Sequence, residues 1–533
     1  MRKILTIIAF CSLSSALFPL DISDDCTSIL VTKGASQDGS VMITYACDAE
    51  FLPQLQYTPA ADHEKDDYIE LDDWKGGIVK IKQVPHTYAV VGLINEHQVA
   101  IGETTTSGRK ELHNPEGLLH YGMLMQLMLQ RAGTAKEGVQ VIVDLVEEYG
   151  YSSTMEAFSI SDPKEAWILE MIGRGSGEKG AIWVALRVPD GYVSCHANLS
   201  RISEIPFKDK KNCMYSKDVK SFAIEKGYYD PNSGEPFRFN KAYGDINPLG
   251  LRVCEARVWS VFRRCAPSLN LSSDYHRAVE GAEPYPLWIK PDDKLSVQDV
   301  MSLTRDHYEG TEFDMTKGID AGDFGSPYRW RPLTWEIDSV KYSWERPVAT
   351  QQTAFSFISQ SRSWLPNPLG GVYWYGIDDA YTTCFVPFYC SITEIPNAYK
   401  TGNLQKFSWD SAWWVFNFVS NYANLKYSYM IKDIQAIQGE LENIAVTSQP
   451  AIEKAALALY KSDPQLMEYY LTNYCNSHAE NVVEKWIELG EHLITKYNDG
   501  YVKDENGKPK GVGYPESWLR EVVKSRPEQF KLK

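Results

Sequence analysis

Two short runs of apolar and β-branched residues, separated by turn formers, predict a β-hairpin near the start of the chain. One strand is expected at residues 28–32 and the other at 41–45, and the turn formers Gly34, Asp38 and Gly39 lie between them. Cys26 stands at the entrance of the first strand.

The pattern after this hairpin predicts more strands on either side of one helical block. Val139, Ile142, Val143 and Val146 recur at helical spacing, and Gly150 is placed to end that helix. Hairpins, then helices, then further strands argue for an α+β fold and against a regular parallel βαβ array. The other expected strands are residues 88–94, 99–101, 157–161, 166–172, 181–188 and 192–197.

The pattern also suggests how the chain is divided. Residues 205–245 and 305–347 are polar and rich in turn formers, so we expect them to be surface insertions. Apolar and aromatic residues return at helical spacing over 408–498. We therefore expect a catalytic domain over 26–405 and a helical C-terminal region over 406–533.

Composition and charge narrow the function classes. The chain has 533 residues, of which 44% are hydrophobic and 23% are charged, as in globular proteins. Its 54 basic and 70 acidic residues give a net charge of −16, which repels phosphate backbones and argues against a nucleic-acid partner. No long charge-free apolar run follows the N-terminal segment, so no later membrane span is expected.

The N-terminal residues have the pattern of a secretory signal peptide. Arg2 and Lys3 precede an uncharged run over 4–20, and small residues favour cleavage after Ala16. The alternative, a membrane anchor, needs a longer uninterrupted apolar segment. We expect a signal peptide at 1–16, a short propeptide at 17–25 and export to the periplasm or the extracellular space.

The ten cysteines bear on the same question. In an oxidising compartment most of them are expected to pair, and Cys384 and Cys390 are near enough in sequence to close a small loop. The spacing leaves the connectivity open.

Familiar cofactor motifs are weak or absent. Gly175, Gly177 and Gly180 match a dinucleotide fingerprint, but a strand and not a helix is expected after them, so a hairpin loop is the better interpretation. The chain lacks P-loop, zincin and α/β-hydrolase motifs, and His113 and His120 have no ligand spacing. We expect neither an organic cofactor nor a metal.

Cys26 is the strongest candidate for chemistry. If a second cleavage freed it as the N-terminus, its α-amine, with an ordinary pKa of about 7.7–8.0, would accept the proton of its own thiol. No histidine would then be needed. The alternative from chemistry alone is a structural half-cystine, since most secreted cysteines pair.

Residues 26–36, Cys-Thr-Ser-Ile-Leu-Val-Thr-Lys-Gly-Ala-Ser, resemble the mature N-terminus of the cysteine dipeptidases among the N-terminal-nucleophile hydrolases. These enzymes are relatives of the secernins and, more distantly, of choloylglycine hydrolases. The resemblance continues in the same order along nearly the whole chain. Its further motifs are residues 95–105, 148–151, 165–167, 183–191, 197–202, 363–366, 374–378, 386–389 and 413–414.

The resemblance implies an αββα sandwich, two antiparallel sheets between helical layers, with a nucleophile at the start of the first strand. It implies Cys26 as nucleophile, Asp48 as the residue that orients its amine, Asn198 as oxyanion donor and Arg257 as an active-site arginine. Arg252, five residues from Arg257, makes the last assignment ambiguous. The more distant relatives carry Arg-Asn-x-Asp where this chain has Tyr-Ala-Cys-Asp over 45–48, so the arginine and asparagine roles are vacant or filled elsewhere.

The implied reaction is hydrolysis of an amide bond through a thioester, and the resemblance implies dipeptides with a free N-terminus as substrates. One alternative is an amidase for another acyl group, such as a bile-salt or penicillin-type amide. A different class is an exported glycan-binding protein that stacks sugars on tryptophans, namely Trp364, Trp374, Trp413 and Trp414. The sequence leaves open whether the protein is a homo-oligomer.

Overall fold

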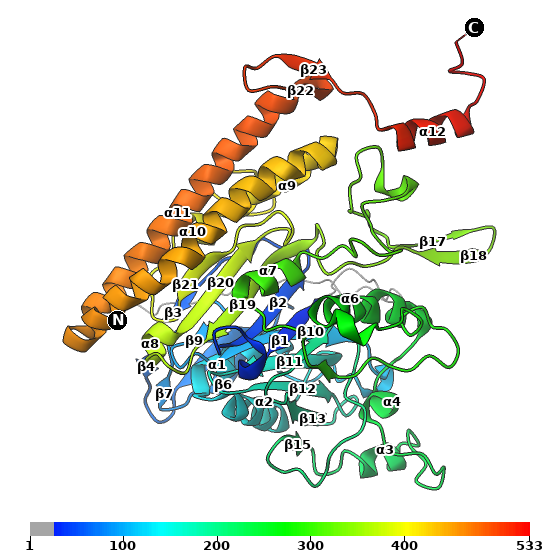
Figure 1. Cartoon of the computed structure of the whole chain (residues 1–533). Coiled ribbons are helices and arrows are strands. Elements are labelled where there is room, and N and C mark those ends of the chain that lie inside the picture. Colours follow the sequence, from blue (N-terminus) through cyan, green and yellow to red (C-terminus); the bar gives the residue numbers. More distant parts are fainter. Residues whose placement is uncertain (1–25, 533) are drawn as a thin grey trace.

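Two antiparallel sheets form the centre of the computed structural model, which describes residues 26–532 (Figure 1). The expected signal peptide at 1–16 and propeptide at 17–25 lie outside the described residues. Helices pack on both sheets, and two long helices follow towards the C-terminus (Figure 1). The α+β class expected from the order of elements is confirmed.

The first sheet carries the predicted N-terminal hairpin at its centre. Its strands β1 and β2 pair antiparallel, with Leu30 opposite Ile43. Strand β14 pairs with the other edge of β1, with Ser28 opposite His196. In spatial order the sheet comprises β16 (Trp288–Ile289), β14 (Val193–His196), β1 (Ser28–Val31), β2 (Val41–Asp48), β19 (Thr353–Ser361), β20 (Gly371–Ile377) and β21 (Val386–Tyr389).

The second sheet contains the run of strands expected after the helical block. One prediction differs, because the strand expected at 88–94 is interrupted at Gly92. Gly92 has φ of 54°, and a Cβ there would lie 2.6 Å from the Tyr373 ring, so a side chain at this turn would clash. In order the strands are β15 (Cys213–Tyr215), β13 (Ile182–Arg187), β12 (Ala166–Ile172), β11 (Met155–Ser161), β10 (Ala100–Thr106), β9 (Ile94–Asn95), β8 (Val90–Val91) and β3 (Tyr57–Thr58).

Helices cover the two sheets as their apolar stripes dictate. Helices α1 (Tyr121–Arg131) and α2 (Ala135–Tyr149) pack on the second sheet, and α2 ends at Gly150, whose φ is 81°. Helices α9 (Ala412–Ala423), α10 (Tyr427–Ser462) and α11 (Pro464–Tyr497) pack against β20 and β21 (Figure 1). No helix within residues 26–532 is both long enough and apolar enough to cross a bilayer.

Shorter elements complete the described chain. They are α3 (Ser221–Glu225), α4 (Phe239–Tyr243), α5 (Pro248–Gly250), α6 (Ala256–Cys265), α7 (Val297–Thr304), α8 (Asn367–Gly370) and α12 (Glu516–Ser525), with the strand pairs β4 (Ala61–Asp62) and β7 (His86–Thr87), β5 (Tyr68–Asp72) and β6 (Ile78–Lys82), β17 (Thr334–Ile337) and β18 (Val340–Ser343), and β22 (Tyr501–Lys503) and β23 (Pro509–Gly511).

The expected cysteine pairing is wrong for this structure. The nine cysteines of residues 26–532 form no disulfide with one another, and all of them are buried. Cys384 and Cys390 lie on either side of strand β21, so an extended segment separates residues that are close in sequence. The cysteines serve as small apolar side chains in the core.

Candidate active site

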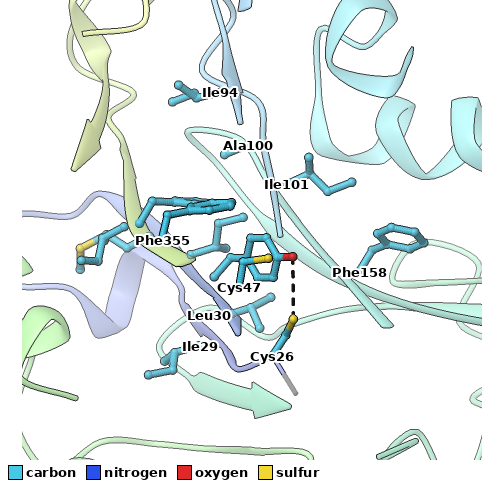
Figure 2. Close-up of a cluster of buried hydrophobic side chains, with 14 of the residues drawn as sticks. Cys26, Ile29, Leu30, Cys47, Ile94, Ala100, Ile101, Phe158 and Phe355 are labelled. Atoms are coloured by element: carbon cyan, nitrogen blue, oxygen red, sulfur yellow. Dashed lines mark hydrogen bonds between the residues drawn. The ribbon is translucent and has the colours of Figure 1, made fainter. Parts of the chain in front are cut away.

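Cys26 lies directly before β1, at the centre of the first sheet. Its side chain is 6% exposed. Backbone hydrogen bonds in both directions join Thr27 and Ala46, at 3.3 and 3.0 Å, which sets Cys26 opposite Cys47 on the neighbouring strand. Figure 2 shows both cysteines among buried apolar side chains, with Phe355 on the side of Cys47. The sheet therefore holds the candidate nucleophile in a defined position.

Two polar groups surround the sulfur. The Cys26 Sγ lies 3.8 Å from the Tyr45 hydroxyl, the contact dashed in Figure 2, and 3.6 Å from Glu103 Oε1. The Tyr45 hydroxyl donates a hydrogen bond of 2.6 Å to the same Glu103 oxygen. Contact with Cys47 raises the pKa of the Cys26 thiol well above its ordinary value, and burial and the charge of Glu103 raise it further. The thiol is thus held protonated until another group takes its proton.

Arg257 links Cys26 to a second chain segment. It lies on α6, is fully buried, and its Nη1 donates to the Cys26 carbonyl at 2.8 Å and to the Thr27 hydroxyl at 2.9 Å. Arg252, the competing assignment, instead pairs with Glu345 at 2.6 Å. The structure therefore brings Arg257, and not Arg252, to Cys26.

Asn198 lies beside Arg257, just after β14. Its Oδ1 accepts a 3.0 Å hydrogen bond from Arg257 Nη2, and its Nδ2 donates a 2.7 Å bond to the Thr105 carbonyl. Its φ of 61° lies in the left-handed region, which asparagine tolerates better than most residues. An amide nitrogen carries two hydrogens, so Nδ2 retains a second donor.

Asp48 ends β2 and is fully buried. It forms an ion pair with Arg346 and accepts a 2.5 Å hydrogen bond from the Thr353 hydroxyl. Burial raises its pKa above the ordinary value, whereas the Arg346 charge and these hydrogen bonds oppose that shift. Asp48 and Cys26 line the same cavity.

Sequence reasoning missed three charged residues near Cys26. Arg346 lies in the polar segment 305–347, which was expected to be a surface insertion, and carries no motif, so only the fold could bring it to Asp48. Glu103 stands within the motif over 95–105 and was given no role. Glu156, on β11, lies opposite Thr105 of β10. The alternation of strand positions was the only sequence signal that could have placed Glu156 beside Glu103 and Thr105.

A cavity of about 130 Å³ opens at Cys26. Its lining is mostly apolar and aromatic, and it contains no lysine or arginine. Within residues 26–532 no cluster of three or more histidine, cysteine or acidic side chains is arranged to hold a metal ion. The lining residues include Tyr45, Cys47, Asp48, Phe51, Trp74, Thr105, Tyr121, Met125, Phe355, Tyr373 and Tyr375.

The tryptophans of the glycan-binding alternative do not form one stacking surface. Trp374 is completely buried, and its indole N–H donates to Gln360 at 3.2 Å. Trp364 is 51% exposed. Most aromatic side chains of strands β19, β20 and β21 are buried in the core.

Comparison with known proteins gives one family. The model of peptidase family C69 matches residues 68–440, a segment that contains Glu103, Asn198, Arg257 and Arg346, whereas Cys26 and Asp48 precede it. The chain is 25% identical over 450 residues to a probable dipeptidase of Latilactobacillus sakei, covering 81% of this chain and 87% of that protein. It is 24% identical over 442 residues to dipeptidase A of Lactobacillus helveticus, covering 79% and 84%, respectively. A probable dipeptidase of Salmonella dublin is 27% identical over 384 residues, covering 68% and 80%.

Proposed function

The chain belongs to peptidase family C69, and from this premise we propose that it is a cysteine-type dipeptidase whose nucleophile is Cys26. The observation that carries the proposal is the position of Cys26. Its thiol faces a cavity at the start of a central strand, and Arg257 fixes its carbonyl. The names of its relatives, dipeptidase A among them, indicate the substrate class.

The proposed mechanism begins with cleavage of the bond between Asp25 and Cys26. The freed α-amine accepts the thiol proton, and the thiolate attacks the substrate carbonyl to form a tetrahedral intermediate. Collapse of this intermediate breaks the C–N bond, releases the C-terminal amino acid and leaves a thioester on Cys26. Water then hydrolyses the thioester and restores the thiol. The layered helices and sheets support assignment of the αββα sandwich of N-terminal-nucleophile hydrolases.

The remaining candidate residues have supporting roles in this proposal. Asp48 orients the freed amine, with Arg346 in the arginine role left open by Tyr45. Asn198 donates its second amide hydrogen to the oxyanion, because its first is taken by Thr105. Arg257 positions both Cys26 and Asn198 through its two guanidinium nitrogens.

Processing is the first testable prediction. A free α-amine is required, so active protein is expected to begin at Cys26 and to contain 533 − 25 = 508 residues. Intact-mass measurement and N-terminal sequencing of protein that hydrolyses Ala-Ala would check this. Full activity in protein that still carries residues 17–25 would contradict the amine-as-base mechanism. Finding the mature protein only inside the producing cell would contradict the proposed export.

The dependence of activity on pH is the second prediction. kcat/KM for Ala-Ala should rise with pH as the coupled amine and thiol of Cys26 lose a proton, because only the neutral amine accepts one. Asp48→Asn removes a negative charge that favours the ammonium form, so its profile should shift to lower pH while the maximal rate falls.

The matched comparison is Asn198→Ala. Loss of an oxyanion donor should lower kcat by about 10²–10³-fold and leave the pH profile in place, because the amide does not titrate there. Initial rates measured across the pH range for both variants would check the two roles. An unchanged profile and rate in both would remove these residues from the mechanism.

A further inference from the structure

A pair of buried carboxyl groups lies beneath the nucleophile, and the mechanism above uses neither. Glu103 of β10 and Glu156 of β11 both have 0% exposure. The Thr105 hydroxyl lies between them, 3.2 Å from Glu156 Oε1 and 3.5 Å from Glu103 Oε2. Thr105, Tyr45 and Cys26 line the cavity, and the two carboxyl groups lie behind them, in contact with these three side chains.

The pair lacks a cationic partner within the described chain. Neither glutamate is paired with a lysine, arginine or histidine among the ion pairs of residues 26–532, and each carboxyl group shifts the pKa of the other through a hydrogen bond between them. Burial raises the pKa of both carboxyl groups, and the charge of Glu103 raises that of Glu156 further. Two such groups are costly to bury unless a ligand completes the site.

The position of Glu103 beside the nucleophile is also unfavourable for an unliganded thiol. Its Oε1 lies 3.6 Å from Cys26 Sγ, and its charge disfavours the thiolate. A cation bound between the carboxyl groups would lower this penalty further, in addition to the ammonium that forms on Cys26 when its amine takes the thiol proton. The nearby Arg257 does not do so, since its guanidinium is occupied by Cys26, Thr27 and Asn198.

A dipeptide carries a cation at the required place. Its α-nitrogen is separated from the scissile carbonyl carbon by a single carbon, a distance of about 2.5 Å from standard bond lengths. Attack requires that carbonyl carbon to lie roughly 3–3.5 Å from the sulfur. The α-ammonium group must therefore come within a few ångströms of Cys26 Sγ, where Glu103 Oε1 is already found.

We propose that Glu103 and Glu156 form the subsite that binds the α-ammonium group of the substrate. This assignment rests on the proposed dipeptidase function and names the residues that select for the free amine of the substrate. Tyr45 and Thr105 hold the two carboxyl groups in place by donating hydrogen bonds to them. Selection acts on the residue that becomes the acyl group, which must have a free amine.

The opposite end of the substrate meets a different environment. The cavity lining contains no lysine or arginine to pair with a C-terminal carboxylate. Recognition therefore depends on the N-terminal residue. The preferred substrates are amides of an unblocked amino acid, which include dipeptides and aminoacyl amides. N-acylated peptides should be poor substrates because they would bury the carboxyl pair without a cation.

The test compares Ala-Ala, alanine amide and N-acetyl-Ala-Ala as substrates of the processed enzyme. Wild-type protein should prefer Ala-Ala to N-acetyl-Ala-Ala by at least about 100-fold and should cleave alanine amide. Glu103→Gln and Glu156→Gln should each lower kcat/KM for Ala-Ala on the order of 10- to 100-fold, mainly through KM, because each weakens hydrogen bonding to a charged group. Their activity on N-acetyl-Ala-Ala should change by less than a few-fold, so the preference for a free amine should collapse.

Glu148→Gln, an exposed substitution of the same chemistry on α2, is the matched control and should retain the wild-type preference. The outcomes separate the two proposals. Ala-Ala hydrolysis with an equal loss on blocked and free substrates in both variants would overturn the subsite and leave the dipeptidase function intact. Absence of Ala-Ala hydrolysis by processed wild-type protein would overturn both. The wild-type preference is measured independently of whether either variant folds.

Discussion

Cys26→Ala should abolish hydrolysis of Ala-Ala, with a loss of at least about 10⁴-fold in kcat, because it removes the attacking sulfur, and Cys47, the other cysteine of the cavity, has no freed α-amine of its own to take its proton. Cys26→Ser should be much slower than wild type but active, since the hydroxyl keeps a nucleophilic atom at the same position. Steady-state rates and single-turnover trapping of the thioester would check both variants.

The matched control for Cys26 is Cys475→Ala. Cys475 is also buried and free, but it lies on α11 and does not line the cavity. Its replacement should leave kcat within a few-fold of wild type. Because Cys47 also lines the cavity, inactivation by an alkylating reagent alone would not identify the nucleophile. Appreciable turnover by Cys26→Ala would contradict the central assignment.

Arg346→Met should lower the free energy of unfolding by about 3–5 kcal/mol, the usual cost of leaving one member of a buried ion pair alone. Arg346 and Asp48 are 1% and 0% exposed, respectively, so water does not take the place of the missing partner. The loss should shrink as pH falls. Arg346 keeps the Asp48 pKa lower than burial alone would, so without Arg346 the carboxyl group takes up a proton at higher pH and is then neutral.

Chemical unfolding would measure this loss, and two further variants serve as comparisons. The double variant Asp48→Asn/Arg346→Met should recover much of the lost stability, because it leaves no unpaired charge. Lys485→Met breaks an exposed pair with Glu488, in which the side chains are 43% and 54% exposed, and should cost less than about 1 kcal/mol. Equal losses in the single and double variants would show that the pair itself contributes little.

Periodicity predicted the parts of the fold that depend on local pattern. The strands of the N-terminal hairpin and the four strands over 155–196 follow from short apolar runs bounded by turn formers, and α2 follows from helical spacing that ends at Gly150. The strand expected at 88–94 was wrong because Gly92 must leave room for Tyr373, a residue far away in sequence. The expected pairing of Cys384 with Cys390 was wrong because the extended strand β21 lies between them, so residues that are close in sequence are held apart in space.

The candidate site also divides into residues that the sequence identified and contacts that only the fold shows. Cys26, Asp48, Asn198 and Arg257 were named from the resemblance, and the structure brings Asn198 and Arg257 to Cys26. The sequence could not show which arginine reaches Cys26, because that depends on how α6 packs against β14. Arg346 and the pairing of Glu103 with Glu156 depend on contacts between distant segments, for which no periodicity or motif carries a signal.

The long sequence separation of the contacts around Cys26 also has a consequence for folding kinetics. The hydrogen bond from Arg257 to Cys26 spans 231 positions, and the ion pair of Arg346 with Asp48 spans 298. Contacts of such sequence separation form only after large loops have closed, which makes them slow compared with the hairpin of β1 and β2. The pairing of β2 with β19 is equally long-range, since it places Asp48 opposite Thr353. Appearance of a reactive Cys26 would then indicate that the whole catalytic domain has folded. A chain that stops folding earlier would carry Cys26 without the arginine contacts that its site requires.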